Sequence, residues 1–173
     1  GVRMLKSPFD LYLYGALLER LRPGTVIEVG TLEGGSAVWF ADQMQIHGIK
    51  PCVLSVDNNS RPLISDPRIR FLEADAVNLA SVLGDELLSR LPKPWLVIED
   101  SAHTFEVTRA VLDFFDASLA PGDYIVVEDG PNRAVADFLK RKHPRYEVDV
   151  ALCDFFGPNY TYNPRGYIQR IDC

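Results

Sequence analysis

The sequence is short of basic residues. It has 18 Lys and Arg against 24 Asp and Glu, which gives a formal net charge of −6. Proteins that bind nucleic acid cluster Lys and Arg against the phosphates, so this balance argues against a nucleic-acid partner. The densest basic run, residues 140–143, stands at the end of a predicted helix, where positive charge complements the helix dipole.

Cysteine and long apolar runs are also scarce. The three cysteines, Cys52, Cys153 and Cys173, are an odd number and lack CxxC spacing, which argues against disulfides and a zinc site. Free thiols in a reducing compartment are expected. No apolar run approaches the roughly 20 residues that cross a bilayer, and no secretory signal is present. We therefore expect a cytoplasmic protein without a membrane partner; a missing N-terminal segment is left open.

The remaining composition is that of an ordinary globular protein. Of the 173 residues, 47% are hydrophobic and 24% are charged, so a sizeable core can form without disulfides. We find no repeat, low-complexity segment or linker in the sequence. A single domain over residues 1–173 is predicted, and the oligomeric state, a homo-oligomer included, is left open.

Short apolar runs alternate with helical patterns along the chain. A first helix is predicted after a cap at Ser7, and it ends before Pro23. The runs that follow are hydrophobic almost throughout, as strands covered on both faces are. They are residues 25–29, 52–56, 69–72, 95–98 and 124–127, and helices are predicted at about 34–47, 77–89, 104–119 and 132–142. This alternation predicts right-handed crossovers and a parallel sheet.

The end of the chain follows another pattern. Residues 146–152 and 166–171 are predicted as strands joined only by a loop, so they should pair antiparallel. The predicted fold class is α/β: a doubly wound, Rossmann-like, mainly parallel seven-stranded sheet with an antiparallel C-terminal hairpin and helices on both faces. In such sheets, ligands bind beyond the carboxyl ends of the strands.

The turn after the first strand, EVGTLEGGS, suits an amino-acid group. Gly30 allows a tight turn, and Gly34 opens a helix whose N-terminal amides, together with Ser36, can bind a carboxylate. Glu28 would repel a pyrophosphate but attract an ammonium group. The alternative is a tight connection that binds no ligand.

Acidic residues end the second and third strands. Asp57 lies where it can accept hydrogen bonds from both hydroxyls of a ribose, and Asp75 is placed to receive an adenine amino group. Each has a structural alternative, a turn at Asp57 and a helix cap at Asp75. Ammonium, carboxylate, ribose and adenine sites together describe S-adenosylmethionine. Asp100, at the end of the fourth strand, is counted with this site.

Three carboxylates end the fourth and fifth strands. If these strands are neighbours, Asp100, Glu128 and Asp129 come within reach of one point, where their mutual repulsion calls for a cation. Oxygen ligands favour Mg²⁺, with Mn²⁺ and Ca²⁺ as alternatives. His103 is the predicted catalytic base for a metal-bound hydroxyl. The alternative is a set of solvated acids and a surface histidine, and strand alternation points Glu99 to the other face.

The motifs EVGTLEGGS, VDNN, EADA, IEDSAH and VVEDG, in this order, resemble class I S-adenosylmethionine-dependent methyltransferases. With KSPFDLYLY near the start and NPRGYIQR near the end, the chain more closely resembles the cephalosporin hydroxylase / rhamnosyl O-methyltransferase family. The resemblance implies the fold of catechol-type, metal-dependent O-methyltransferases. It implies a site composed of metal ligands Asp100, Glu128 and Asp129, a base at His103 where catechol enzymes carry a lysine, and cofactor contacts at Glu28, Gly30, Ser36, Asp57 and Asp75.

Two features depart from the family pattern. A Glu-Asp pair replaces the Asp-Asn of catechol enzymes, which adds negative charge and strengthens the need for a cation. The sequence also lacks the longer N-terminal segment that helps to cover the site in relatives.

We therefore expect methyl transfer from S-adenosylmethionine, with a divalent ion, to a hydroxyl of a sugar, glycosylated natural product or catechol-like diol. The loop 153–167 should roof the pocket, and Lys6 and Arg165 are candidates for binding an anionic group. Four aromatic residues of the loop could contact the acceptor: Phe155, Phe156, Tyr160 and Tyr162. The alternative function is a non-catalytic or hydroxylase-associated S-adenosylmethionine-binding protein. A non-haem iron site is disfavoured because its two-histidine, one-carboxylate set is missing.

Overall fold

The structure is a computed structural model that describes residues 1–59, 62–130, 132–157 and 160–171. The predicted free thiol of Cys173 lies outside the described residues. Cys52 and Cys153 are both free thiols, as expected. The single domain predicted for residues 1–173 stays a prediction.

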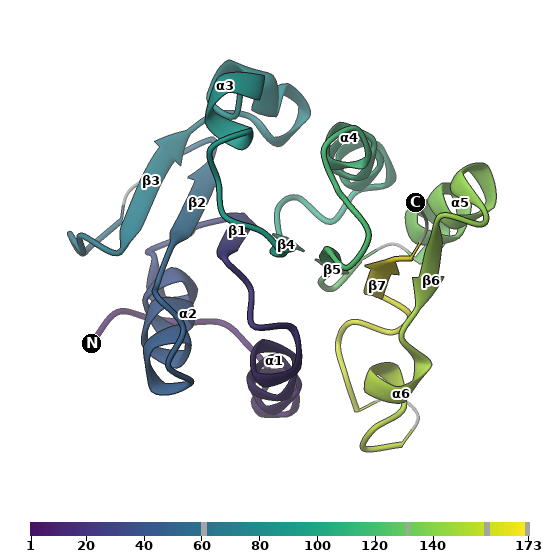
Figure 1. The fold of residues 1–173 in the computed structure, drawn as a ribbon, viewed down its shortest axis with the longest axis horizontal. Helices are drawn as coiled ribbons and strands as arrows, with labels where there is room; N and C mark the ends of the chain where they lie inside the picture. Colours follow the sequence, from purple (N-terminus) through teal and green to yellow (C-terminus); the bar gives the residue numbers. More distant parts are fainter. Residues whose placement is uncertain (60–61, 131, 158–159, 172–173) are drawn as a thin grey trace.

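The described strands form one seven-stranded sheet in the order β3-β2-β1-β4-β5-β7-β6 (Figure 1). Strands β1 to β5 pair in parallel, whereas β7 pairs antiparallel with both β5 and β6. The predicted mainly parallel sheet with an antiparallel C-terminal pair is confirmed. The strands are β1 (Thr25–Val29), β2 (Val53–Asp57), β3 (Ile69–Glu73), β4 (Trp95–Glu99), β5 (Tyr124–Val127), β6 (Tyr146–Val148) and β7 (Tyr167–Arg170).

Helices cover both faces of this sheet, as Figure 1 shows. On one face, α1 (Pro8–Leu21), α2 (Gly35–Ile46) and α6 (Val150–Cys153) pack against strand residues that include Val26 and Ile98. The other face carries the 3-10 helix η1 (Ala76–Ser81) and the helices α3 (Asp85–Leu88), α4 (Phe105–Asp116) and α5 (Asn132–Lys142). Because side chains alternate along a strand, neighbouring residues at each strand end face different helices.

Capping residues begin and end the helices close to their predicted bounds. Ser7 caps α1 by accepting a hydrogen bond from the amide of Phe9, and Thr104 caps α4 by accepting one from the amide of Val107. Arg22, in a left-handed conformation, ends α1 at the predicted stop. The two N-caps fix where α1 and α4 begin, and the Thr104 cap thereby ends the loop that follows β4.

Two predicted elements are wrong in their extent. The helix expected over 77–89 is instead η1 and the four-residue α3, because Asn78 leaves the helical conformation (φ −133°, ψ 45°) and Gly84 begins α3 from an extended one. The strand expected over 146–152 stops at Val148. Asp149 then caps α6 by accepting a hydrogen bond from the amide of Leu152, 3.1 Å away.

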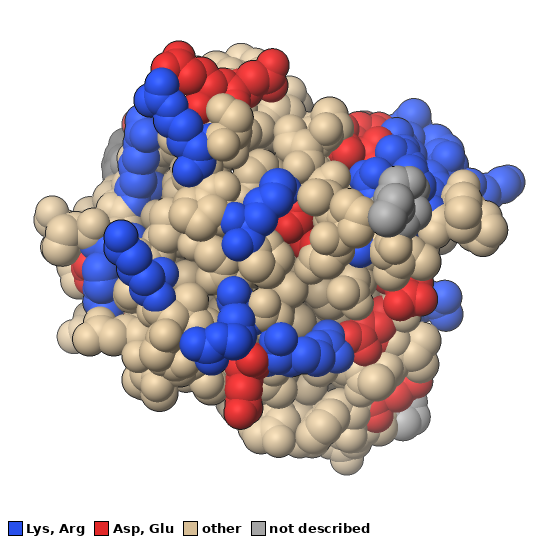
Figure 2. Space-filling model, in the orientation of Figure 1, with Lys and Arg blue, Asp and Glu red and all other residues tan. Residues whose placement is uncertain are grey.

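Charged residues of both signs lie interspersed on the face seen in Figure 2. The last turn of α5 carries Lys140, Arg141 and Lys142, as expected for a run that complements the helix dipole. Arg141 also pairs with Asp113 and Lys142 pairs with Asp116, both on α4. This basic run therefore contributes to joining two helices. Within the described residues, no helix is long and apolar enough to span a membrane.

Candidate active site

A cavity of about 400 Å³ lies beyond the carboxyl ends of β1, β2 and β4. Its size is within the usual range for small-molecule sites, and its place is the one expected for ligands of a doubly wound sheet. The predicted site residues that line it are Gly30, Ser36, Asp57, Asp75, Asp100, His103 and Asp129. Three others, Glu28, Gly34 and Glu128, are absent from the described lining. Seven of the ten site residues predicted from the sequence thus lie in the cavity wall.

The N-terminal segment forms a wall of this cavity that the sequence did not predict. Arg3, Met4, Leu5 and Lys6 all line it, just before α1 begins. The carbonyl oxygen of Arg3 packs against Gly35, where an added Cβ would come within 2.1 Å of it. A side chain at position 35 would therefore push the segment away from α2. Only the small size of Gly35 signals this contact in the sequence.

The first glycine turn is shaped by close packing between strand ends. Gly30 has φ +111°, and a Cβ there would come within 2.0 Å of the carbonyl oxygen of Asp100. Gly34 has φ +90° and precedes α2, where a Cβ would lie 3.2 Å from the ring of Phe71. Gly34 thus opens the helix, as predicted, but lies next to Phe71 and is not among the residues that line the cavity.

Asp57 has both a structural and a cavity-lining position. Its Oδ2 accepts hydrogen bonds from the amides of Thr31 (2.8 Å) and Leu32 (3.0 Å), and its Oδ1 accepts one from the amide of Asn59 (2.9 Å). The carboxylate therefore ties β2 to the glycine turn. Each carboxylate oxygen has two lone pairs, so capacity for further donors remains.

Asp75 combines the two roles considered for it from the sequence. Its carboxylate caps η1 by accepting a hydrogen bond from the amide of Val77 at 3.0 Å, and the exposed residue also lines the cavity. The cap orients the side chain at the end of β3 without removing it from the cavity wall.

Glu28 lies beneath the cavity rather than in its wall. The side chain is fully buried, and Oε2 accepts a hydrogen bond from the hydroxyl of Ser55 at 2.7 Å. Oε1 has no hydrogen-bond partner among the described residues. Burial raises the pKa of this carboxyl above its ordinary value. Glu28 is not among the residues that line the cavity, and its contact with an ammonium group stays a prediction.

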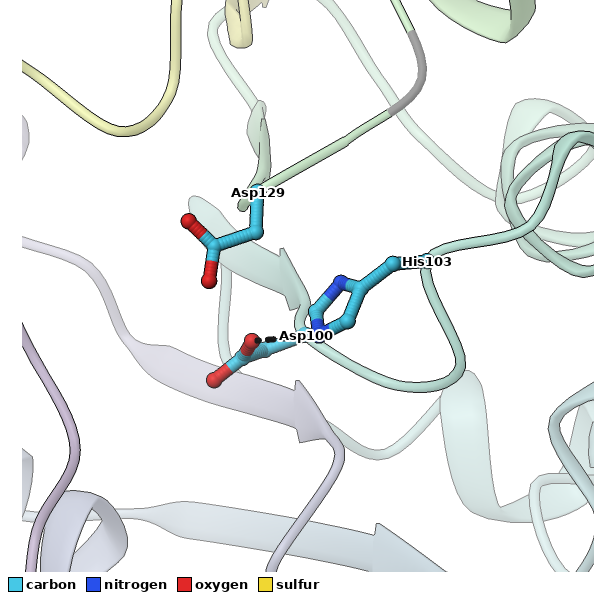
Figure 3. A group of neighbouring side chains, drawn as sticks. All are labelled: Asp100, His103 and Asp129. Atoms are coloured by element: carbon cyan, nitrogen blue, oxygen red, sulfur yellow. Dashed lines mark ion pairs between the residues drawn. The ribbon is translucent and has the colours of Figure 1, made fainter.

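Asp100, His103 and Asp129 form a group at the rim of the cavity (Figure 3). Each offers one ligand atom, and these atoms all lie within 4.8 Å of one another. Nε2 of His103 is 3.8 Å from Oδ1 of Asp100. Partial burial and the nearby Asp100 raise the pKa of Asp129. Two carboxylates and an imidazole at this spacing can hold a divalent cation.

The backbone at this group is strained. His103 has φ +54° and Asp129 has φ +43°, both in the left-handed region that residues other than glycine seldom adopt. In Figure 3 each side chain comes from the loop that follows a strand and points into the space between the loops. Such strain costs on the order of 1–3 kcal/mol per residue, and it is typical of functional sites.

Glu128 does not join the group in which the sequence placed it. Its Oε1 accepts hydrogen bonds from Nζ of Lys6 and from the hydroxyl of Tyr14, both at 2.6 Å. Burial raises the pKa of Glu128 to about 7, an effect that Lys6 opposes. Lys6 also binds Oδ2 of Asp100 at 2.5 Å. Although burial favours a neutral amine, Glu128 and Asp100 raise the pKa of Lys6.

Lys6 therefore lies where the sequence did not indicate. We expected it to bind an anionic group of a ligand, and its ammonium instead bonds two carboxylates of the chain itself. Strand alternation could have predicted that Asp100 and Glu128 lie together on the face of the sheet that α1 covers. It could not have predicted Lys6 beside them, because this lysine comes from outside the sheet. Arg165 is exposed, and its proposed role stays a prediction.

Glu99 faces the other side of the sheet, as predicted. It is fully buried and accepts hydrogen bonds from the amide of Ser101 (3.2 Å), the hydroxyl of Ser101 and the hydroxyl of Thr108 (2.9 Å). These bonds join β4, the loop that carries His103, and α4. Glu99 thus supports the loop from behind.

The loop between α6 and β7 is fixed to α1 through Asp10, which is 2% exposed. Its carboxylate accepts hydrogen bonds from the hydroxyl of Thr161, the amide of Tyr162 (3.0 Å) and the hydroxyl of Tyr167 (3.1 Å). Rings of the loop pack edge to face on Phe9 of α1. Residues 158–159 of this predicted roof lie outside the described residues.

Comparisons with known proteins agree with this arrangement. The sequence profile of the rhamnosyl O-methyltransferase/CmcI family matches residues 1–131. A rhamnosyl O-methyltransferase of Mycobacterium leprae (strain TN) is 32% identical, over 98% of this chain and 81% of its own length. The chain belongs to this family. The family expected from the sequence is therefore confirmed.

Solved structures of CmcI share the fold over nearly the whole chain. One, with Mg and SAM, is 27% identical with a TM-score of 0.82, over 98% of this chain and 74% of its own. Another, with SAH, is 28% identical with a TM-score of 0.74, over 97% of this chain and 78% of its own. The Rossmann-like fold predicted from the sequence is confirmed.

Proposed function

We propose that this protein is an S-adenosylmethionine-dependent O-methyltransferase that uses a divalent cation to methylate a hydroxyl of a sugar or glycosylated natural product. One observation carries the proposal. Asp100, His103 and Asp129 stand at the rim of the cavity that Asp57 and Asp75 also line. Sites for a donor and an acceptor that adjoin in this way allow in-line transfer. Family membership and the CmcI structure with Mg and SAM support it.

The cofactor site would extend across the ends of four strands. Asp57 would accept hydrogen bonds from the ribose hydroxyls, because the amides of the glycine turn already hold its carboxylate in place. Asp75 would receive the adenine amino group. Gly30, Ser36 and Asp100 all line the cavity, and the amino-acid end of the cofactor would lie against them.

The rim group fits a hard divalent ion, with Mg²⁺ favoured over Mn²⁺ and Ca²⁺, because it presents carboxylate oxygens within a few ångströms of one another. Asp100 and Asp129 are the proposed ligands, with Glu128 as a third. When bound, the ion would lower the pKa of the acceptor hydroxyl, and the cofactor would supply the methyl group. His103 would accept the hydroxyl proton at Nε2, since its side chain is 38% exposed and faces Asp100.

The decisive experiment uses methyl-labelled S-adenosylmethionine with a panel of sugars, glycosylated natural products and catechols. Label should reach an acceptor with Mg²⁺ and not with EDTA. Asp129→Asn should lose metal-dependent transfer and keep cofactor binding in calorimetry, whereas Asp85→Asn, at an exposed position on α3, should behave as wild type. Undiminished transfer in EDTA would contradict the metal role. Cofactor binding without transfer to any acceptor would favour a non-catalytic binding protein.

A further inference from the structure

A lysine ammonium lies between two of the three acids predicted to hold the metal. Nζ of Lys6 is 2.5 Å from Oδ2 of Asp100 and 2.6 Å from Oε1 of Glu128. The Lys6 side chain is only 2% exposed. Tyr14 donates a further hydrogen bond to the same oxygen of Glu128 at 2.6 Å. A cation of the chain itself therefore already compensates part of the negative charge of this pair of acids.

Asp100 is shared between this buried pair and the open rim. Its Oδ2 is bound to Lys6, while its Oδ1 faces Nε2 of His103 at 3.8 Å, on the side of Asp129. A divalent ion could approach Oδ1 from the rim without disturbing the lysine. To reach Oε1 of Glu128 as well, the ion would need the oxygen that the lysine holds. The Lys6 ammonium and the divalent ion cannot both contact Oε1 of Glu128, because two cations in contact repel each other strongly in a buried site.

We propose that Lys6 is a positioning residue that acts as an internal cation, bonded to Asp100, and competes with the divalent ion for Oε1 of Glu128. Without the metal, its ammonium keeps the two carboxylates together and prevents their repulsion. For Glu128 to hold the metal through Oε1 as the third ligand, the ammonium must leave that oxygen, so the ion pair lowers the metal affinity. The inference rests on the proposed function, since it concerns the same acids.

The competition also connects the metal site with the cofactor cavity. Lys6 ends the segment whose residues Arg3 to Lys6 line that cavity, and Arg3 is packed on Gly35 at the start of α2. The ion pairs of Lys6 are thus one of the contacts that hold the segment in place. An ion that displaces Lys6 removes this contact.

Metal affinity measured without cofactor or acceptor tests the proposal. Mn²⁺ binding would be followed by electron paramagnetic resonance, and Mg²⁺ binding by calorimetry. Lys6→Met keeps the length of the side chain and removes its charge, so the metal Kd should fall by at least about tenfold, the equivalent of losing one charged hydrogen bond. Lys6→Arg retains the charge and should stay within about threefold of wild type. Lys50→Met, at an exposed lysine, should leave the Kd unchanged.

Thermal unfolding supplies a second readout. Without metal, Lys6→Met should have a lower Tm than wild type, because Asp100 and Glu128 are then uncompensated. Saturating Mg²⁺ should restore most of this loss, since the ion takes the place of the ammonium. If the variant folds only with metal, its affinity can be measured by chelator competition on protein prepared in Mg²⁺.

An unchanged or weaker metal affinity in Lys6→Met would overturn the proposal, as would an absence of binding in both proteins. The fate of the proposed function is decided separately. If the affinities change as expected but neither protein transfers a methyl group, the competition stands and the function fails. Methyl transfer that persists in EDTA would show the reverse case, in which the protein is a methyltransferase but does not need the metal.

Discussion

Gly30 at the end of β1 lies directly against the backbone carbonyl of Asp100 at the end of β4. A Cβ built on Gly30 would come within 2.0 Å of the Asp100 carbonyl oxygen, and Gly30 has φ +111°. The amide of Asp100 in turn donates to the carbonyl of Val29 at 2.8 Å. The cofactor turn and the proposed metal ligand are therefore parts of one tightly packed contact.

Gly30→Ala should disrupt both sites at once. The change imposes a left-handed conformation on alanine and forces the Asp100 carbonyl to move, so we expect a loss of more than about 2 kcal/mol in the free energy of unfolding. Gly48→Ala is the matched control, because Gly48 has φ +65° with nothing within 4 Å of an added Cβ. Denaturant unfolding of both variants separates the clash from the backbone strain. Equal losses in the two would mean that the contact with Asp100 is of no consequence.

Glu99→Gln should loosen the loop that carries His103. The carboxylate accepts three hydrogen bonds, from the amide and hydroxyl of Ser101 and the hydroxyl of Thr108, and an amide can accept on one atom only. We expect a loss of about 1–3 kcal/mol in the free energy of unfolding and a weaker affinity for Mn²⁺. The exposed Glu106, on the first turn of α4, gives the control Glu106→Gln. Unaltered Mn²⁺ affinity in Glu99→Gln would separate the loop from the metal site.

The sequence predicted the sheet well because the buried strands are short, apolar runs with clear ends. The order of acids at those ends followed from parallel pairing, so the placement of Asp57, Asp75 and Asp100 around one cavity could be expected. The failures have local causes. Helix 77–89 depended on the backbone at Asn78 and Gly84, and strand 146–152 depended on the cap that Asp149 makes.

The contacts that the sequence did not predict join residues that are far apart in the chain. Lys6 meets Glu128 across 122 positions, and Asp10 meets Thr161 across 151 positions. No spacing rule connects such pairs, because they depend on how α1 packs on the finished sheet. The sequence also did not predict the backbone of Asp129, whose left-handed conformation turns it away from Glu128. Alternation along β5 cannot describe a residue that no longer belongs to the strand.

His103→Asn should remove the proposed base and keep the backbone. Asparagine tolerates the left-handed conformation that His103 adopts at φ +54°, so the loop should be preserved. We expect methyl transfer to fall by about 10²–10⁴-fold with little change in cofactor affinity. His143→Asn, at an exposed histidine, serves as the control. Activity retained between about pH 6 and 9 in His103→Asn would exclude an essential base at this position.

Asp116→Asn should lower stability at neutral pH and have less effect in acid. Although burial opposes it, hydrogen bonds from Lys142 and Tyr146 hold the pKa of Asp116 below its ordinary value. A lowered pKa in the folded state means that the stabilisation is present above about pH 4 and is lost as the pH falls through the folded pKa. We expect a loss of about 1–3 kcal/mol at pH 7 that shrinks on acidification, measured by urea unfolding.

The exposed Glu147 on β6 provides the control for this prediction. Glu147→Gln should show a small effect with little dependence on pH, because its side chain lies in solvent. A constant difference between wild type and Asp116→Asn from neutral to acid pH would mean that the charge of Asp116 contributes nothing.

Asp10→Asn should affect acceptor binding through the loop between α6 and β7. The Asp10 carboxylate accepts hydrogen bonds from the Thr161 hydroxyl, the Tyr162 amide and the Tyr167 hydroxyl. In the variant, the NH₂ group of the asparagine side chain would face some of these donors and could not accept from them. We expect a loss of about 1–3 kcal/mol in stability and a KM for the acceptor that rises more than kcat falls. The exposed Glu19 on α1 gives the control Glu19→Gln. Because Asp10 does not line the cofactor cavity, S-adenosylmethionine affinity should be retained. An unchanged acceptor KM, together with the expected loss of stability, would show that the loop serves the fold and not the acceptor.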